Sequence, residues 1–113
     1  VGLNDLATAR TDLDEALKLV PQDPLAWLLS ATLARRTGDL TRAQADIDKA
    51  AELSADDANV ALEAGNIALA AGATGAARIA FQGAITAQPD SDAARLAKAA
   101  LDRLGAEAQP PRP

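Results

Sequence analysis

Two of the side chains that most often carry enzyme chemistry are missing from this 113-residue sequence. It holds no cysteine and no histidine, and its serines, Ser30, Ser54 and Ser91, lie in no recognisable motif. Without these groups there is no thiol nucleophile, no Ser–His–Asp triad and no zinc site of nitrogen and sulfur ligands. A Ser–Lys dyad with Lys98 is a remote alternative. The composition predicts a protein that is not an enzyme and binds no metal or cofactor.

Carboxylates are the one reactive group that the sequence supplies in close pairs: Asp12/Asp14, Asp46/Asp48 and Asp56/Asp57. General acid–base catalysis needs two such groups that converge on one point. Residues two apart on a helix instead diverge by roughly 200°, because one turn takes about 3.6 residues. We therefore interpret these pairs as solvated surface or helix caps.

The net charge of −5 argues against a nucleic-acid partner, because phosphates attract basic surfaces. Only the doublet Arg35–Arg36 is locally basic. The least charged stretch, residues 64–77, is too short and too weakly hydrophobic to insert into a membrane. The compartment stays open, because a chain without cysteine suits either side of a membrane.

The elements that position these side chains are predicted to be helices. Alanine occurs 30 times and leucine 16 times, whereas Trp27 and Phe81 are the only aromatic residues. Alanine and leucine are strong helix formers, and strands favour β-branched and aromatic residues. The predicted fold class is all-α.

A repeat of 34 residues runs through the sequence. The aligned positions are Gly38/Gly72, Ala9/Ala43/Ala77, Leu13/Ile47/Phe81, Ala16/Ala50/Ala84 and Pro21/Ala55/Pro89. They divide the chain into a half repeat (1–22), two full repeats (23–57 and 58–91) and a last helix (92–104). Each full repeat reads as two helices, with Asp23 or Asp57 capping the first and Gly38 or Gly72 at the turn.

The full register resembles the tetratricopeptide repeat (TPR) family, whose unit is a helix–turn–helix of the same length. The first full repeat matches the family pattern at Trp27, Ala31, Gly38, Ala43, Ile47 and Ala50, with Ala55 where the family has proline. The second matches at Gly65, Gly72, Ala77, Phe81, Ala84 and Pro89, with Ala61 in place of the tryptophan. The resemblance covers about two and a half repeats. It implies a single domain over 1–104, a right-handed superhelical stack (an α-solenoid) of about six helices.

The two ends differ from the middle. In the last helix, Arg95 and Lys98 stand where earlier repeats face a partner helix, which predicts a capping helix, followed by a disordered proline-rich tail at 105–113. The opening half repeat lacks its first helix, and the chain opens on valine, so we expect a piece of a longer protein. The exposed leucines of the opening half repeat are predicted to drive self-association, for example as a homodimer. They are Leu3, Leu6, Leu13 and Leu17.

The resemblance also implies a groove, lined by the first helix of each repeat, that holds a peptide or partner helix. Carried over by position, its residues are Leu25, Leu28, Thr32, Arg35, Asn59, Leu62, Asn66, Leu69, Leu96, Ala100 and Arg103. Leu28 and Thr32 stand where some family members hold a ligand's terminal carboxylate with lysine and asparagine, so that subtype is disfavoured. The predicted function is a non-catalytic scaffold for protein–protein interaction. One alternative is a self-assembling structural module. Another is that Leu28, Leu62 and Leu69 are partly core residues and that neighbouring groups satisfy Asn66.

Overall fold

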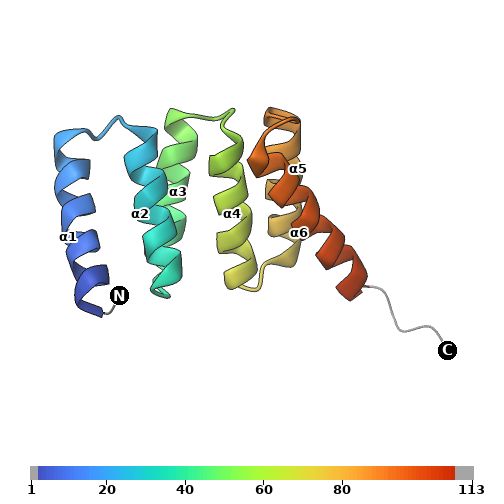
Figure 1. The fold of residues 1–113 in the computed structure, drawn as a ribbon, viewed down its shortest axis with the longest axis horizontal. Helices are drawn as coiled ribbons and strands as arrows, with labels where there is room; N and C mark the ends of the chain where they lie inside the picture. The colour runs from blue at the N-terminus through green and yellow to red at the C-terminus, as the bar shows by residue number, and fades with distance from the viewer. Residues whose placement is uncertain (1–2, 109–113) are drawn as a thin grey trace.

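The computed structural model describes the backbone of residues 3–108 and the side chains of residues 5–106. The described chain consists of six helices joined by short turns: α1 (Leu3–Leu19), α2 (Pro24–Arg36), α3 (Leu40–Leu53), α4 (Ala58–Ala70), α5 (Thr74–Ala87) and α6 (Asp92–Ala108). The helices run up and down one after another along the long axis, with α3 behind α2 and α5 behind α6 (Figure 1). With extents of 55 × 30 × 22 Å, the molecule is an elongated stack, as the repeat predicted.

The predicted turns and caps are present. Asp23 accepts a hydrogen bond from the backbone N–H of Leu25 (3.0 Å), and Asp57 accepts one from that of Asn59 (2.8 Å). Gly38 and Gly72 have φ values of 84° and 79°, a conformation that other residues rarely adopt. These signals fix where each hairpin turns back on itself.

An additional cap comes from outside its own helix. The side-chain oxygen Oε1 of Gln88, in the turn after α5, accepts a hydrogen bond of 2.7 Å from the backbone N–H of Ala58. Ala58 is the first residue of α4, whose initial N–H groups have no partner within the helix. The corresponding residue of the first repeat is Pro24, which has no N–H to satisfy.

The core consists of the small and large apolar residues that recur in register. The inward side of α3 (Ala43, Ile47 and Ala50) and that of α5 (Ala77, Phe81 and Ala84) are 0–1% exposed. Two core clusters result, one around Ile47 between α2, α3 and α4, and one around Phe81 between α4, α5 and α6. Each core is shared with the following helix, so each repeat depends on its neighbour.

The last helix extends beyond its predicted end. We expected α6 to stop at Leu104 with Gly105 as a terminator, but the helix continues through Gly105 to Ala108. Gly105 does not have a positive φ, and the residues after it, Ala106, Glu107 and Ala108, are good helix formers. A glycine inside a helix costs only about 1 kcal/mol and does not by itself end it. The rest of the predicted tail, 109–113, lies outside the described residues.

The inner face of α1 lacks a covering helix within the described chain. At the positions of the fully buried Ala43, Ile47 and Ala50, α1 carries Ala9, Leu13 and Ala16, which are all half-buried. Leu6 is half-buried too, but Leu17 is only 8% exposed. The prediction that Leu17 is an exposed leucine was therefore wrong, because it packs inward beside α2. The side chain of Leu3 lies outside the described residues.

Candidate functional site

A hollow of about 400 Å³ lies between α4 and α6, the first helices of two successive units. Its lining combines residues of the predicted groove with one neighbour, Ala99: Leu62, Asn66, Leu96, Ala99, Ala100 and Arg103. A second hollow of about 260 Å³ continues along the same two helices and shares Ala100 and Arg103 with the first. The two hollows together form one depression along α4 and α6, which we call the α4/α6 groove.

The α4/α6 groove has an apolar floor and polar groups at its side. Leu62 and Leu69 are half-buried, and Leu96 is 59% exposed. The Asn66 amide and the Arg103 guanidinium make no hydrogen bond or ion pair with any side chain or backbone group between residues 5 and 106. The groove thus offers apolar contact, an amide able to donate and accept, and a fixed positive charge.

The part of the predicted groove on α2 is organised differently. Glu63 of α4 is only 6% exposed, and it receives a two-bond ion pair from Arg35, with N–O distances of 2.5 and 3.2 Å. The hydroxyl of Thr32 donates a third hydrogen bond to the same carboxylate (3.1 Å). Thr32 and Arg35 are therefore engaged in holding α2 against α4. Sequence reasoning missed Glu63, which stands at the register position of Leu29.

The remaining predicted groove residues lie apart from the α4/α6 groove. Leu28 is half-buried and packs against the core around Ile47, which agrees with the alternative of a core role for single leucines. Leu25 is 58% exposed on α2. Asn59 is exposed and lines a separate polar hollow at the turn before α4, which Gln88 also lines.

A buried polar network joins the first three helices. Asp46 of α3 is 3% exposed and accepts hydrogen bonds from the Ser30 hydroxyl (2.5 Å) and from Nε of Arg42 (3.0 Å). Arg42 also reaches across to Asp14 of α1 (2.9 Å), and Arg10 pairs with Asp14 (3.0 Å) while donating to Ser30. The interpretation of Asp46 as solvated surface was wrong. The four-residue spacing of Arg10/Asp14 and of Arg42/Asp46 is the feature of the sequence that could have predicted these ion pairs.

The network changes the acidity of Asp14. Partial burial acts to raise the pKa of its carboxyl, but the hydrogen bond from Arg42 and the charges of Arg10 and Arg42 outweigh burial and lower it below its ordinary value. Burial acts to lower the pKa of Arg42, but the hydrogen bonds and charges of Asp14 and Asp46 outweigh burial and raise it. The arrangement therefore stabilises the charged forms of Asp14 and Arg42.

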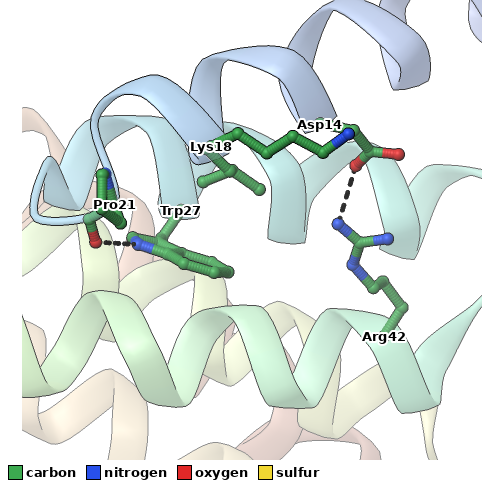
Figure 2. Close-up of a pocket in the computed structure, with 6 residues that line it drawn as sticks. Asp14, Lys18, Pro21, Trp27 and Arg42 are labelled. Carbon is green, nitrogen blue, oxygen red and sulfur yellow. Dashed lines mark hydrogen bonds and ion pairs between the residues drawn. The ribbon is translucent and has the colours of Figure 1, made fainter.

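A further hollow, of about 480 Å³, lies where α1, α2 and α3 meet, and sequence reasoning did not predict it. Figure 2 shows the Trp27 indole directed at Pro21, where its N–H donates to the backbone carbonyl (2.8 Å), and Asp14 directed at Arg42. Lys18 also lines this hollow. Because Trp27, Asp14 and Arg42 all use their polar groups to hold the three helices together, this hollow is a product of helix packing.

The described residues contain no cluster of acidic groups able to hold a metal ion, and none of helices α1–α6 has the length and hydrophobicity needed to span a bilayer. Of the paired carboxylates of the sequence, Asp57 is a helix cap and Asp12 is exposed, as expected, whereas Asp14 and Asp46 lie in ion pairs.

Comparison with known proteins agrees with this architecture. A family model described as tetratricopeptide repeat matches residues 1–58 and residues 28–92. No curated protein matches the sequence significantly. The two overlapping matches cover most of the chain, including both glycine turns and both buried faces of α3 and α5. The chain belongs to the tetratricopeptide repeat family.

Proposed function

We propose that this chain is a non-catalytic interaction module that binds a peptide segment in the α4/α6 groove. TPR repeats generally mediate protein–protein interaction, and the family is typically a non-catalytic scaffold. The observation that carries the proposal is the pair Asn66 and Arg103, which have no hydrogen-bond or ion-pair partner among residues 5–106, beside exposed Leu96. Arg35 and Thr32 already have an internal partner in Glu63, whereas Asn66 and Arg103, the polar residues that line the α4/α6 groove, have none among residues 5–106.

The groove defines the chemistry of the ligand. An apolar side chain of the peptide would contact Leu62 and Leu96, and the Asn66 amide would meet a backbone N–H or carbonyl of the peptide. An acidic group one or two residues away would reach Arg103, which sits between the two hollows. The contact area is small, so we expect modest affinity.

Binding of designed peptides to the purified chain tests this proposal. The probes are synthetic peptides that place one leucine at varied spacings from one glutamate, and binding is measured by fluorescence anisotropy. We expect Leu96→Glu and Arg103→Glu each to weaken the best peptide about tenfold. Ile79→Glu is the matched control, because Ile79 is 73% exposed on α5, away from the groove. If the unchanged chain and the three variants all bound the peptide equally, the α4/α6 groove would be refuted as the binding site.

A further inference from the structure

The two end helices present complementary halves of one repeat. α1 occupies the register of a second helix, and its inner face is half-buried where α3 and α5 are fully buried. α6 occupies the register of a first helix, and it packs on α4 and α5 through Ala93, Ala97 and Ala100. On its outer side Arg95 and Lys98 are exposed, together with Ala99, which also lines the edge of the α4/α6 groove. The equivalents of Lys98 and Ala99 on α2, Ser30 and Ala31, meet α3, and the equivalent of Ala99 on α4, Gly65, meets α5.

Residue sizes at these faces match. In the first repeat, fully buried Ala31 of α2 shares a core cluster with Ile47 of α3. In the second, Gly65 of α4 lies directly against the Phe81 ring of α5. In both cases a small residue on the first helix accommodates a large one on the second. The same register positions on the end helices hold exposed Ala99 on α6 and half-buried Leu13 on α1.

Charges at these faces match as well. In the first repeat, Ser30 of α2 donates a hydrogen bond of 2.5 Å to Asp46 of α3. The corresponding positions on the end helices are Lys98 on α6 and Asp12 on α1. Both side chains are exposed, and neither makes an ion pair or hydrogen bond with the described residues. A polar pair within the first repeat thus becomes an opposite-charge pair between the two ends of the chain.

We propose that α6 of one molecule packs on α1 of a second copy, so that the two helices complete a hairpin across the interface. Lys98 of one copy then faces Asp12 of the next, and Leu13 packs over Ala99. Leu29, which is 49% exposed on the same open side of α2, is covered by the same contact. The interface is head-to-tail, because α6 of one copy meets α1 of the next, so the same contact can recur from copy to copy. This inference goes beyond the groove function and does not rest on it.

Sedimentation velocity of the 113-residue chain from micromolar to millimolar concentration tests the proposal. We expect reversible association that Lys98→Glu and Asp12→Lys each weaken about tenfold, because each reversal places like charges opposite one another. The doubly reversed variant restores the opposite charges and recovers the association. Lys18→Glu and Asp56→Lys are matched controls of the same charge change at exposed sites outside both faces. They leave the association unchanged.

A size substitution distinguishes this register from general stickiness. Ala99→Leu adds apolar surface to an exposed helix position, where leucine leaves the fold intact. In the proposed register it collides with Leu13 and weakens the association, whereas nonspecific hydrophobic contact would be strengthened. A chain that stays monomeric at millimolar concentration overturns the proposal. The proposal is also overturned if neither single charge reversal weakens the association, or if the doubly reversed variant does not recover it.

Discussion

The ring of Phe81 lies directly against the backbone of Gly65. A Cβ at position 65 would come within 2.3 Å of Cε1 and 2.5 Å of Cδ1 of that ring, and Phe81 is fully buried. Since the ring cannot move into solvent, only glycine fits at position 65. The first repeat has the pair Ala31 and Ile47 at the same crossing: Ala31 is one methyl group larger than Gly65, and Ile47 is smaller than Phe81.

Gly65→Ala should therefore destabilise the protein by about 2 kcal/mol, because overpacking in a close-packed core outweighs the helix propensity that alanine gains. Adding Phe81→Ile converts the pair into that of the first repeat and relieves the overlap. In urea unfolding followed by circular dichroism, the double variant should be more stable than the sum of the two single changes implies. Strict additivity would contradict the close contact.

Ala77→Leu should destabilise the fold by about 1–3 kcal/mol, because Ala77 is fully buried where α5 packs on its neighbours. Ala76→Leu is the matched control: it makes the same change at the adjacent, exposed position of α5. Thermal unfolding should distinguish the two variants by several degrees. If the two melted alike, the assignment of the inner face of α5 would be wrong.

Arg35→Met should destabilise the protein by about 2 kcal/mol at neutral pH, because it leaves the buried Glu63 carboxylate with Thr32 as its partner. Adding Glu63→Leu should recover most of this loss, since leucine is the residue that the first repeat holds at this register position. Urea unfolding of the single and double variants measures the difference. A double variant less stable than Arg35→Met alone would show that the carboxylate has another favourable partner.

Acid should weaken the contact of Asp14 with Arg10 and Arg42. The pKa of Asp14 is lower in the folded protein than its ordinary value of 3.8, so its contribution to stability is present above about pH 4 and is lost as the pH falls through the folded pKa. Between about pH 5 and pH 3, the urea midpoint of Asp14→Asn should therefore fall less steeply than that of the unchanged protein. Asp12→Asn, at an exposed position nearby, is the control and should follow the unchanged protein.

The helices, the turns and the inner faces could be predicted from the sequence, because each rests on a local signal that recurs every 34 residues. Gly38 and Gly72 mark the turns, and the columns through Ile47 and Phe81 mark the core. Residues that line the hollow between α4 and α6 could also be predicted, since the register of the first helices places Leu62, Asn66, Leu96 and Arg103 on one side of the stack.

Interactions between repeats could not be predicted, because they depend on which side chain reaches across to the next helix. Glu63 occupies a position that holds Leu29 in the preceding repeat, so the periodic pattern gave no sign of its ion pair with Arg35. Asp46 lies on the polar side of the helical pattern but becomes buried once Ser30 and Arg42 close over it. Gly105 predicted the end of α6, but the helix propensity of the residues after it outweighs the cost of one glycine, so the helix continues.

The hydrogen bond from the backbone N–H of Ala58 to the side chain of Gln88 couples the opening of α4 to the opening of the turn after α5. The first N–H of α4 is satisfied only while the turn after α5 is in place, 30 residues further along the chain. Local opening of that turn therefore also frees the start of α4, and amide hydrogen exchange at the two places should respond together. The second repeat and α6 would then open as one cooperative unit, while Pro24, with no N–H to lose, leaves the first repeat without this link.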